Sequence, residues 1–288
     1  MDDRAPAVGV SIADGGRRVM LKWHMLRRAA DDPPFSIANL RLGLAAGASL
    51  EIDVRALADG AWVCLHDDGL DEETDGSGPV KAADTAAIGK LRISGSDYAP
   101  PLLDQIAREV AITPDAGGCL QIDLKEPAEG LSSRAIGRFA AAIAPVAGRC
   151  RLSGTDWNAV RTLAEAVPSL SLGFDPLDLA AGRGLADADS INAFVEEVAA
   201  TAPAASAFYV HYRFVERALS FGINPVRRLK QNGAMVDIWT LDPSTPDIGD
   251  VLRRMVEAGA DQITTNDPIE MAALWQRRAR GGKDSGRR

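Results

Sequence analysis

The sequence predicts a single domain folded as a (β/α)8 TIM barrel with a small insertion. Short apolar runs alternate with longer helix-like stretches along the chain of 288 residues, which is typical of βα repeats and a parallel sheet. Eight such repeats in about 250 residues match the usual size of this barrel. A doubly wound open sheet is the alternative. No Gly-x-Gly-x-x-Gly motif follows the first run, which removes the usual dinucleotide-binding reason for an open sheet.

The expected strands are short apolar runs bounded by turn-forming residues. The barrel strands are expected at Arg18–His24, Ser49–Val54, Gly118–Leu124, Arg149–Ser153, Leu170–Phe174, Ala207–His211, Ala234–Trp239 and Gln262–Thr264. An extra strand is expected at Ala61–His66, shortly after the second barrel strand.

The expected helices carry residues that favour helix ends. We expect helices at Ser36–Ala46, Ser132–Ala144, Asp156–Ala166, Ile191–Ala200, Asn224–Asn232 and Ile248–Ala258. Ser36, Ser132 and Asp156 are good N-caps, because their side-chain oxygens can accept a hydrogen bond from a free backbone N–H. Gly47 and Gly259 follow two of the helices, and glycine commonly ends a helix in the left-handed conformation.

Composition divides the chain into three parts. Residues 1–16 form an N-terminal extension, acidic and rich in small residues, and residues 17–276 form the barrel domain. Within the barrel domain, residues 67–100 are rich in Asp, Gly and Ser and interrupt the βα rhythm, so we expect an insertion above the barrel mouth. Residues 277–288 are basic and contain glycine, so we expect a disordered tail.

The charge balance excludes some classes of partner. A formal net charge of −8 argues against non-specific nucleic-acid binding, which needs a basic surface. It does not exclude a small phosphate-bearing substrate, because a bound metal can reverse the charge of a pocket. Three widely spaced cysteines without a Cys-x-x-Cys pair predict reduced thiols rather than a zinc cage.

The chain shows no signal of secretion or membrane insertion. The N-terminus lacks a basic segment followed by an apolar run, and no stretch approaches the ~18 apolar residues of a membrane span. We therefore expect a cytoplasmic protein without an integral membrane segment. The sequence leaves the oligomeric state open.

Acidic residues gather at the expected strand ends, which form the active-site face of a barrel. Glu51 and Asp53 are two residues apart, so they project from the same side of their strand. Such close carboxylates repel each other unless a cation compensates, and a hard divalent cation suits oxygen ligands. A solvent-facing acidic strand end is the alternative. Asp123 and Lys125 alternate in the same way, and they suit either a metal ligand with a phosphate contact or a simple ion pair.

The histidines also follow expected strands. His24 and His66 would lie at one barrel end beside three carboxylates, which suits a general acid–base pair, although a lone histidine in such a place more often serves structure. His211 ends the sixth strand and is either a substrate contact or a core or rim residue. Trp239 ends the seventh strand and forms either an apolar wall for the substrate alcohol or ordinary core.

Seven motifs, in order, resemble those of the glycerophosphodiester phosphodiesterases. They are His24, Gly47–Val54, Asp59–Asp67, Leu70–Val80, Pro101–Leu103, Trp239–Asp242 and Gly259–Pro268. Each motif alone is weak, but their order and spacing together are specific, and the resemblance covers about residues 18–275.

The resemblance implies a TIM barrel that cleaves a glycerophosphodiester or a related phospholipid-derived diester. It implies one divalent cation, Mg2+ or Ca2+. The residues that it implies are Glu51, Asp53 and Asp123 as metal ligands, His24 and His66 as acid–base catalysts, and Lys125 as a phosphate contact.

The chain departs from the family pattern at the phosphate contacts. The family usually has Arg-Gly after its first histidine, whereas Met25–Leu26 stand here. The role of that phosphate-binding arginine is unfilled unless Arg27 or Arg28 takes it through a turn of the loop. The acid of the third strand, usually Glu, is Asp123. The reaction type is therefore better supported than the substrate.

Three other interpretations stay open. Related phospholipase D toxins, which act on sphingomyelin or lysophospholipids, share the motifs around His24, Glu51 and Asp123, but those toxins are secreted and disulfide-linked. A catalytically degenerate barrel would bind phosphoesters without turnover. A lyase or aldolase would use Lys125 as a Schiff base, which the nearby carboxylates disfavour because they keep the lysine protonated.

Overall fold

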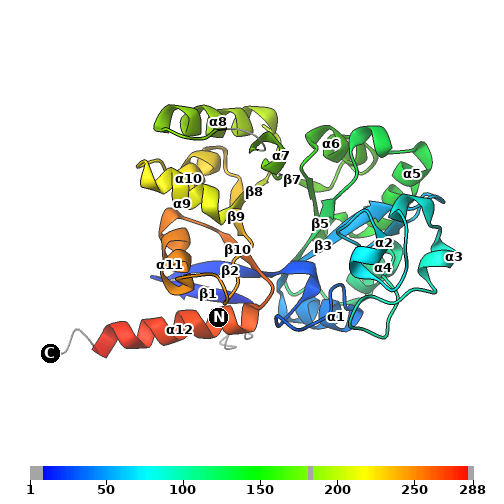
Figure 1. Ribbon diagram of the computed structural model, residues 1–288, viewed down its shortest axis with the longest axis horizontal. Helices are drawn as coiled ribbons and strands as arrows, with labels where there is room; N and C mark the ends of the chain where they lie inside the picture. The colour runs from blue at the N-terminus through cyan, green and yellow to red at the C-terminus, as the bar shows by residue number, and fades with distance from the viewer. Residues whose placement is uncertain (1–8, 181–183, 285–288) are drawn as a thin grey trace.

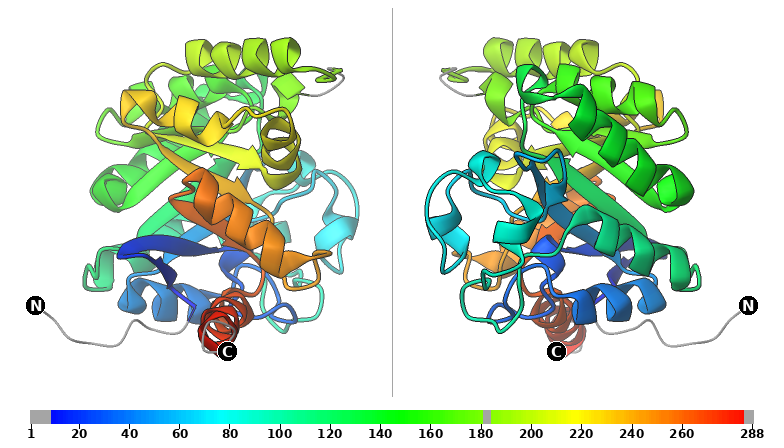
Figure 2. Two further views of the ribbon diagram at one scale, coloured as in Figure 1. Left: turned by 90° about the vertical axis from the view of Figure 1, so that its left-hand side faces the viewer. Right: turned by 90° about the vertical axis from the view of Figure 1, so that its right-hand side faces the viewer.

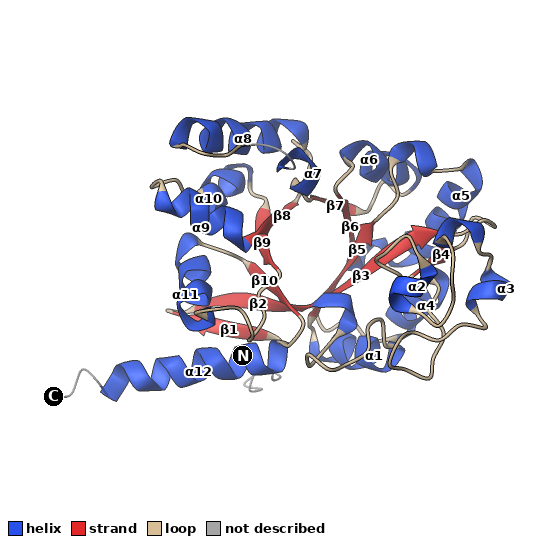
Figure 3. Ribbon diagram, viewed as in Figure 1, coloured by secondary structure: helices blue, strands red, loops and turns tan. Residues whose placement is uncertain are grey.

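The computed structural model describes residues 9–180 and 184–284. In this part of the chain the strands form one ten-stranded sheet, in the order β1-β2-β10-β9-β8-β7-β6-β5-β3-β4, and an additional pairing of β2 with β3 closes it into a ring (Figure 3). The strands are β1 (Ser11–Asp14), β2 (Arg17–Trp23), β3 (Ser49–Ala56), β4 (Trp62–Val63), β5 (Cys119–Leu124), β6 (Cys150–Gly154), β7 (Ser171–Phe174), β8 (Ala207–His211), β9 (Met235–Trp239) and β10 (Gln262–Thr265).

The ring consists of parallel strands. Strands β2, β3, β5, β6, β7, β8, β9 and β10 pair in parallel around it, and they coincide with the eight strands expected from the sequence. The (β/α)8 prediction is therefore confirmed. Because all carboxyl ends of parallel strands meet at one end of a barrel, residues that follow different strands converge there.

Helices surround the ring on the outside (Figure 1). They are α1 (Ile37–Ala46), α2 (Leu70–Glu73), α3 (Thr85–Ile88), α4 (Leu103–Ile112), α5 (Ser133–Ile143), α6 (Trp157–Ala166), α7 (Leu177–Ala180), α8 (Ala188–Thr201), α9 (Tyr212–Ser220), α10 (Pro225–Leu229), α11 (Ile248–Ala258) and α12 (Pro268–Asp284). None of the helices in the described residues has the length and apolar character needed to cross a bilayer.

The predicted helix ends are confirmed. Ser36, Ser132 and Asp156 each accept a backbone N–H at the start of α1, α5 and α6. Gly47 and Gly259 end α1 and α11 with φ angles of 68° and 107°, a left-handed conformation that glycine adopts without steric cost. Local sequence signals therefore set these boundaries.

The insertion projects at one end of the barrel (cyan in Figure 2). It carries α2 and α3 and is folded by two isolated bridges, Gly69 with Pro79 and Thr74 with Ile93. The strand that precedes it is shorter than expected, because β4 ends at Val63 and the next backbone N–H, of Cys64, donates to the carbonyl of Pro101 at 2.8 Å. His66 consequently lies in a loop beyond the strand.

Both chain ends contain more regular structure than the sequence suggested. In the N-terminal extension, β1 pairs antiparallel with β2. At the other end, α12 continues through Asp284, where we expected a disordered tail from residue 277. Alanine, glutamine and arginine favour helix, and Trp275 ties α12 to β1 by donating its Nε1–H to the carbonyl of Ala13 at 2.7 Å. Residues 285–288 of the expected tail lie outside the described residues.

Candidate active site

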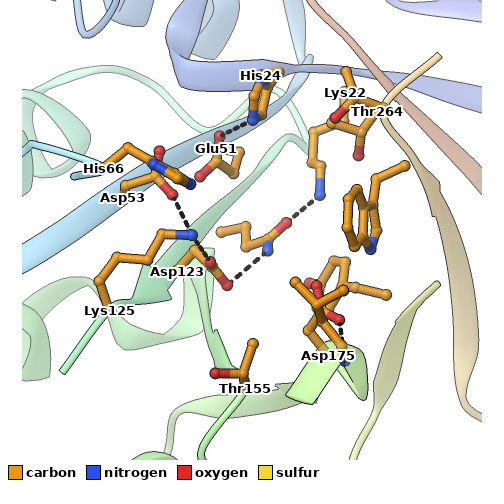
Figure 4. Close-up of a pocket in the computed structure, with 15 residues that line it drawn as sticks. Lys22, His24, Glu51, Asp53, His66, Asp123, Lys125, Thr155, Asp175 and Thr264 are labelled. Carbon is orange, nitrogen blue, oxygen red and sulfur yellow. Dashed lines mark hydrogen bonds and ion pairs between the residues drawn. The ribbon is translucent and has the colours of Figure 1, made fainter. Parts of the chain in front are cut away.

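A pocket of about 240 Å3 opens at the carboxyl ends of the barrel strands. The residues that line it are Lys22, His24, Glu51, Asp53, His66, Gln121, Asp123, Lys125, Thr155, Asp175, Leu177, Tyr209, Trp239, Thr240 and Thr264 (Figure 4). The two candidate catalytic histidines, the three candidate metal ligands, Lys125 and Trp239 thus share one pocket. Arg27 and His211 are not part of this lining.

Strand β3 supplies two buried carboxylates. Glu51 and Asp53 are 3% and 1% exposed, and the alternation of side chains along the strand directs both toward the pocket. Glu51 Oε2 accepts the backbone N–H of Met25 at 2.7 Å. Burial raises the pKa of Glu51 well above its usual value, and the negative charges of Asp53 and Asp123 raise it further. The site therefore holds more negative charge than its own protein partners neutralise.

Strand β5 places a third carboxylate beside this pair. Asp123 is the direct neighbour of Asp53 in the parallel ladder. Lys125 donates to Asp123 Oδ2 at 2.7 Å and forms an ion pair with Asp53 Oδ1 at 2.9 Å. Burial alone would lower the pKa of Lys125, but the two carboxylates raise it above its usual value. Lys125 is therefore a protonated cation at neutral pH.

The three carboxylates suit a divalent cation by charge and donor type. Lys125 forms ion pairs with Asp53 and Asp123, whereas Lys22, another ammonium group in the lining, pairs with Asp237. Asp53 Oδ2 is buried without any hydrogen-bond partner, an arrangement that costs free energy unless a cation or donor satisfies it. Across residues 9–180 and 184–284, no group of three or more His, Cys, Asp or Glu side chains is arranged so that it could hold a metal ion without rearrangement. Lys125 lies between two of the candidate ligands instead.

His24 is held rigidly at the end of β2. Its Nδ1 lies 2.8 Å from Asn266 Oδ1, and Asn266 Nδ2 donates to Asp242 Oδ2 at 2.8 Å. Because this second bond fixes the orientation of the amide, Asn266 presents its oxygen and Nδ1 of His24 carries the proton. Nε2 of the neutral ring then bears a lone pair, 4.0 Å from Glu51 Oε2. Burial lowers the pKa of His24 below its usual value of 6.5.

A strained turn places His24 and Glu51 together. The chain leaves β2 through Met25 and Leu26, whose φ angles of 52° and 60° are uncommon for residues other than glycine. This turn aims the backbone N–H of Met25 at Glu51. Both side chains are buried, so packing holds the turn in place.

His66 is held more loosely. Its side chain is 47% exposed, and Nδ1 lies 2.9 Å from Asp67 Oδ1. The backbone is better fixed than the ring, because the His66 N–H donates to Glu73 Oε2 at 2.6 Å and the carbonyl accepts Arg55 Nε at 2.8 Å. Backbone contacts with Glu73 of the insertion and with Arg55 therefore hold His66 at the edge of the pocket.

Arg27 and His211 take places beside the pocket. Arg27 donates to Asn266 Oδ1 at 3.1 Å, so it neighbours His24 through a shared partner. His211 meets Trp239 edge to face with 4.7 Å between ring centroids, and its Nδ1 accepts the backbone N–H of Arg213 at the start of α9. Burial and Arg213 lower the pKa of His211. His211 lines a small apolar cavity that shares Trp239 with the main pocket.

Sequence reasoning missed several pocket residues. Lys22 precedes His24 by two residues and faces the barrel interior, which the alternation rule could have shown. Asp175 follows β7 and was overlooked as a strand-end residue; burial and Asp123 raise its pKa to about 8. The contact of Asn266 with His24 joins residues 242 positions apart and gave no local signal.

Comparison with known proteins places the chain in one family. The glycerophosphoryl diester phosphodiesterase family model matches residues 33–270. Three solved structures show the same fold. A Silicibacter pomeroyi protein assigned as a glycerophosphoryl diester phosphodiesterase has a TM-score of 0.72 and 20% identity, covering 94% of this chain and 96% of its own. A glycerophosphodiester phosphodiesterase from Agrobacterium tumefaciens has a TM-score of 0.63 and 21% identity, covering 88% and 99%.

A third structure includes a bound product. The Oleispira antarctica phosphodiesterase, in complex with the product sn-glycerol-3-phosphate, has a TM-score of 0.63 and 18% identity, covering 88% of this chain and 95% of its own. No curated protein sequence matched the chain. The family match spans most of the barrel and agrees with the motif resemblance. The chain therefore belongs to the glycerophosphoryl diester phosphodiesterase family and is a phosphoric diester hydrolase.

Proposed function

We propose that this pocket hydrolyses a glycerophosphodiester or a related phospholipid-derived diester with one divalent cation, Mg2+ or Ca2+, and two histidines. The observation that carries the proposal is the convergence of two buried carboxylates, a third that is 14% exposed, and two imidazoles in one pocket at the barrel mouth. The product bound to the Oleispira antarctica phosphodiesterase supports a small glycerol-containing substrate.

Glu51, Asp53 and Asp123 would hold the cation. Hard divalent cations prefer carboxylate oxygens, and Asp53 Oδ2, which has no hydrogen-bond partner, is available as a ligand for such a cation. A bound cation polarises the phosphoryl group and stabilises the negative charge that develops in the transition state. Lys125, which lines the same pocket, would offset charge on the non-bridging phosphate oxygens.

The hydrogen bonds around the histidines suggest how the proton roles divide. His24 presents an unprotonated Nε2 to the pocket, which suits removal of a proton from the attacking oxygen, either of water or of an adjacent hydroxyl of the substrate. His66 lies at the exposed edge of the same pocket, with Nδ1 2.9 Å from Asp67 Oδ1, so it is the candidate that donates a proton to the leaving alkoxide.

The remaining predicted residues are assigned to substrate binding. Trp239 forms an apolar wall of the pocket for the alcohol, and its ring is in edge-to-face contact with the ring of His211. Arg27 shares the partner Asn266 with His24, so it is the candidate for the phosphate contact that Met25 and Leu26 do not provide.

The test is a product-resolved screen of phosphodiesters after exhaustive chelation and after return of Mg2+, Ca2+ or Mn2+. The panel contains glycerophosphodiesters, lysophospholipids and bis(p-nitrophenyl) phosphate. We expect EDTA to abolish release of the alcohol and one of the cations to restore it. Full activity after chelation would remove the cation from the mechanism. Turnover restricted to lysophospholipids would favour the phospholipase D-like alternative, and binding without product would indicate a degenerate barrel.

A further inference from the structure

A layer of buried polar side chains lies inside the barrel, and two of its members, Lys22 and Gln121, line the pocket. Lys22 is 2% exposed and Asp237 is fully buried, and their charged atoms lie 3.2 Å apart. The Lys22 ammonium also donates to Gln121 Oε1. Buried ion pairs are a weak source of stability, because desolvation offsets most of their attraction. We therefore consider which pocket side chain the hydrogen bonds of this layer orient.

The hydrogen bonds of the layer have a fixed direction that leads to Asp123. Because Gln121 Oε1 accepts from Lys22, the amide Nε2 faces the other way and donates to Ser153 Oγ at 2.8 Å. A hydroxyl has one hydrogen to give, and Ser153 directs it to Asp123 Oδ1 at 2.6 Å. The amide of Gln121 also lies 3.5 Å from the same Asp123 oxygen.

The backbone supports this contact. Ser153 on β6 is the direct partner of Asp123 on β5 in the parallel ladder, and Ser153 is fully buried. Of the two carboxylate oxygens of Asp123, Oδ1 is bonded to Ser153, whereas Oδ2 faces Lys125. The layer thus holds one oxygen of Asp123, and the other pairs with Lys125, which lines the pocket.

We infer that Ser153, held by Gln121 and Lys22, is a positioning residue that fixes the carboxylate of Asp123 in the orientation required to bind a divalent cation. This inference rests on the proposed cation site. Loss of hydrogen-bond partners behind metal ligands typically lowers metal affinity about 10–100-fold. Ser153 is not part of the pocket lining, so its effect on a cation there would pass through Asp123.

The experiment measures binding of Ca2+ and Mn2+ by calorimetry to the wild-type protein and to Ser153→Ala. We expect the dissociation constant of Ser153→Ala to rise about 10-fold or more, with a circular dichroism spectrum like that of the wild type. Ser153→Thr keeps the hydroxyl and should restore most of the affinity. Ser49→Ala is the matched control, because it removes another buried barrel serine, at the start of β3, away from Asp123.

A second variant tests whether Gln121 acts on Asp123 through Ser153, in the hydrogen-bond relay Lys22–Gln121–Ser153–Asp123. Gln121→Met abolishes the donor to Ser153 while Lys22 keeps its ion pair with Asp237. We expect a smaller loss of affinity than for Ser153→Ala, and the double variant should bind no more weakly than Ser153→Ala alone. Additive losses would overturn the relay.

The cation site and the positioning role of Ser153 can be disproved separately. A wild-type protein that binds no divalent cation overturns the proposed cation site and this inference with it. A wild-type protein that binds the cation, with unchanged affinity in Ser153→Ala, overturns the positioning role alone and leaves the proposed function intact.

Discussion

The two flanks of the pocket hold their histidines in different ways. On the β2 flank, His24 is bonded to Asn266, approaches Glu51 and follows a strained, buried turn. On the insertion flank, the ring of His66 is nearly half exposed and has one side-chain partner, Asp67. The barrel thus holds one histidine in a fixed tautomer, whereas the other, next to the insertion, has an exposed ring.

If the two histidines form the proposed acid–base pair, its members are held with unequal rigidity. A base must have its lone pair in place before the reaction, and the amide of Asn266 would ensure this for His24. The exposed ring of His66 would give the proposed acid access to solvent. Variants of the two flanks should therefore behave alike when a ring is removed and differently when its support is removed.

Removal of either ring should have the largest effect. His24→Ala and His66→Ala should each lower kcat by about 10²–10⁴-fold, the usual contribution of a general acid or base. Steady-state kinetics on a confirmed substrate measure this, and thermal unfolding shows whether each variant is folded. Turnover like that of the wild type in either variant would end the assignment of that histidine.

Removal of the supporting residues should separate the flanks. Asn266→Ala frees the ring of His24 and should lower kcat by about 10–100-fold, as is typical when the outer partner of an active-site histidine is lost. Asp67→Ala should have a smaller effect, because the ring of His66 is already exposed. A larger loss of kcat in Asp67→Ala than in Asn266→Ala would contradict the view that His24 depends more on its support than His66 does.

The phosphate contact should be found on the β2 flank. Arg27→Ala should raise KM about 10-fold, the magnitude of one charge-assisted hydrogen bond, with a smaller change in kcat. Arg28→Ala is the matched control, since Arg28 lies over the ring of Trp23, 5.8 Å from its centroid, rather than beside Asn266. Equal KM values for the two variants would exclude Arg27 from the site.

The smallest effect concerns proton binding. Burial lowers the pKa of His24, so in the metal-free protein the unfolded state binds more protons than the folded state below about pH 6.5. Folding stability should therefore fall as the pH drops from 7 to 5, and less steeply in His24→Gln. Urea unfolding at several pH values measures the slope, and NMR can follow the ring because the chain has three histidines. A His24 pKa above 6.5 would contradict the burial argument.

Much of the fold could be predicted because its signals are local. Apolar runs and capping residues such as Ser36 and Asp156 act within a few residues of the element that they define. Helices α4, α9 and α12 were not among the expected helices. Strand β1 pairs with β2, its neighbour in the sequence, whereas the contact of Trp275 on α12 with Ala13 on β1 joins the two ends of the chain and has no local signal.

By itself, the sequence determined the order of the barrel elements, the family motifs and the shared side of Glu51 and Asp53, because strand alternation is a property of the local backbone. Only the tertiary structure decided which partners orient those groups. Asn266 reaches His24 because the barrel joins the first strand to the last. Lys22 on β2 meets Gln121 on β5 although β3 lies between these two strands. Closure of the sheet converts distant sequence positions into hydrogen-bond partners, and no local pattern encodes such a contact.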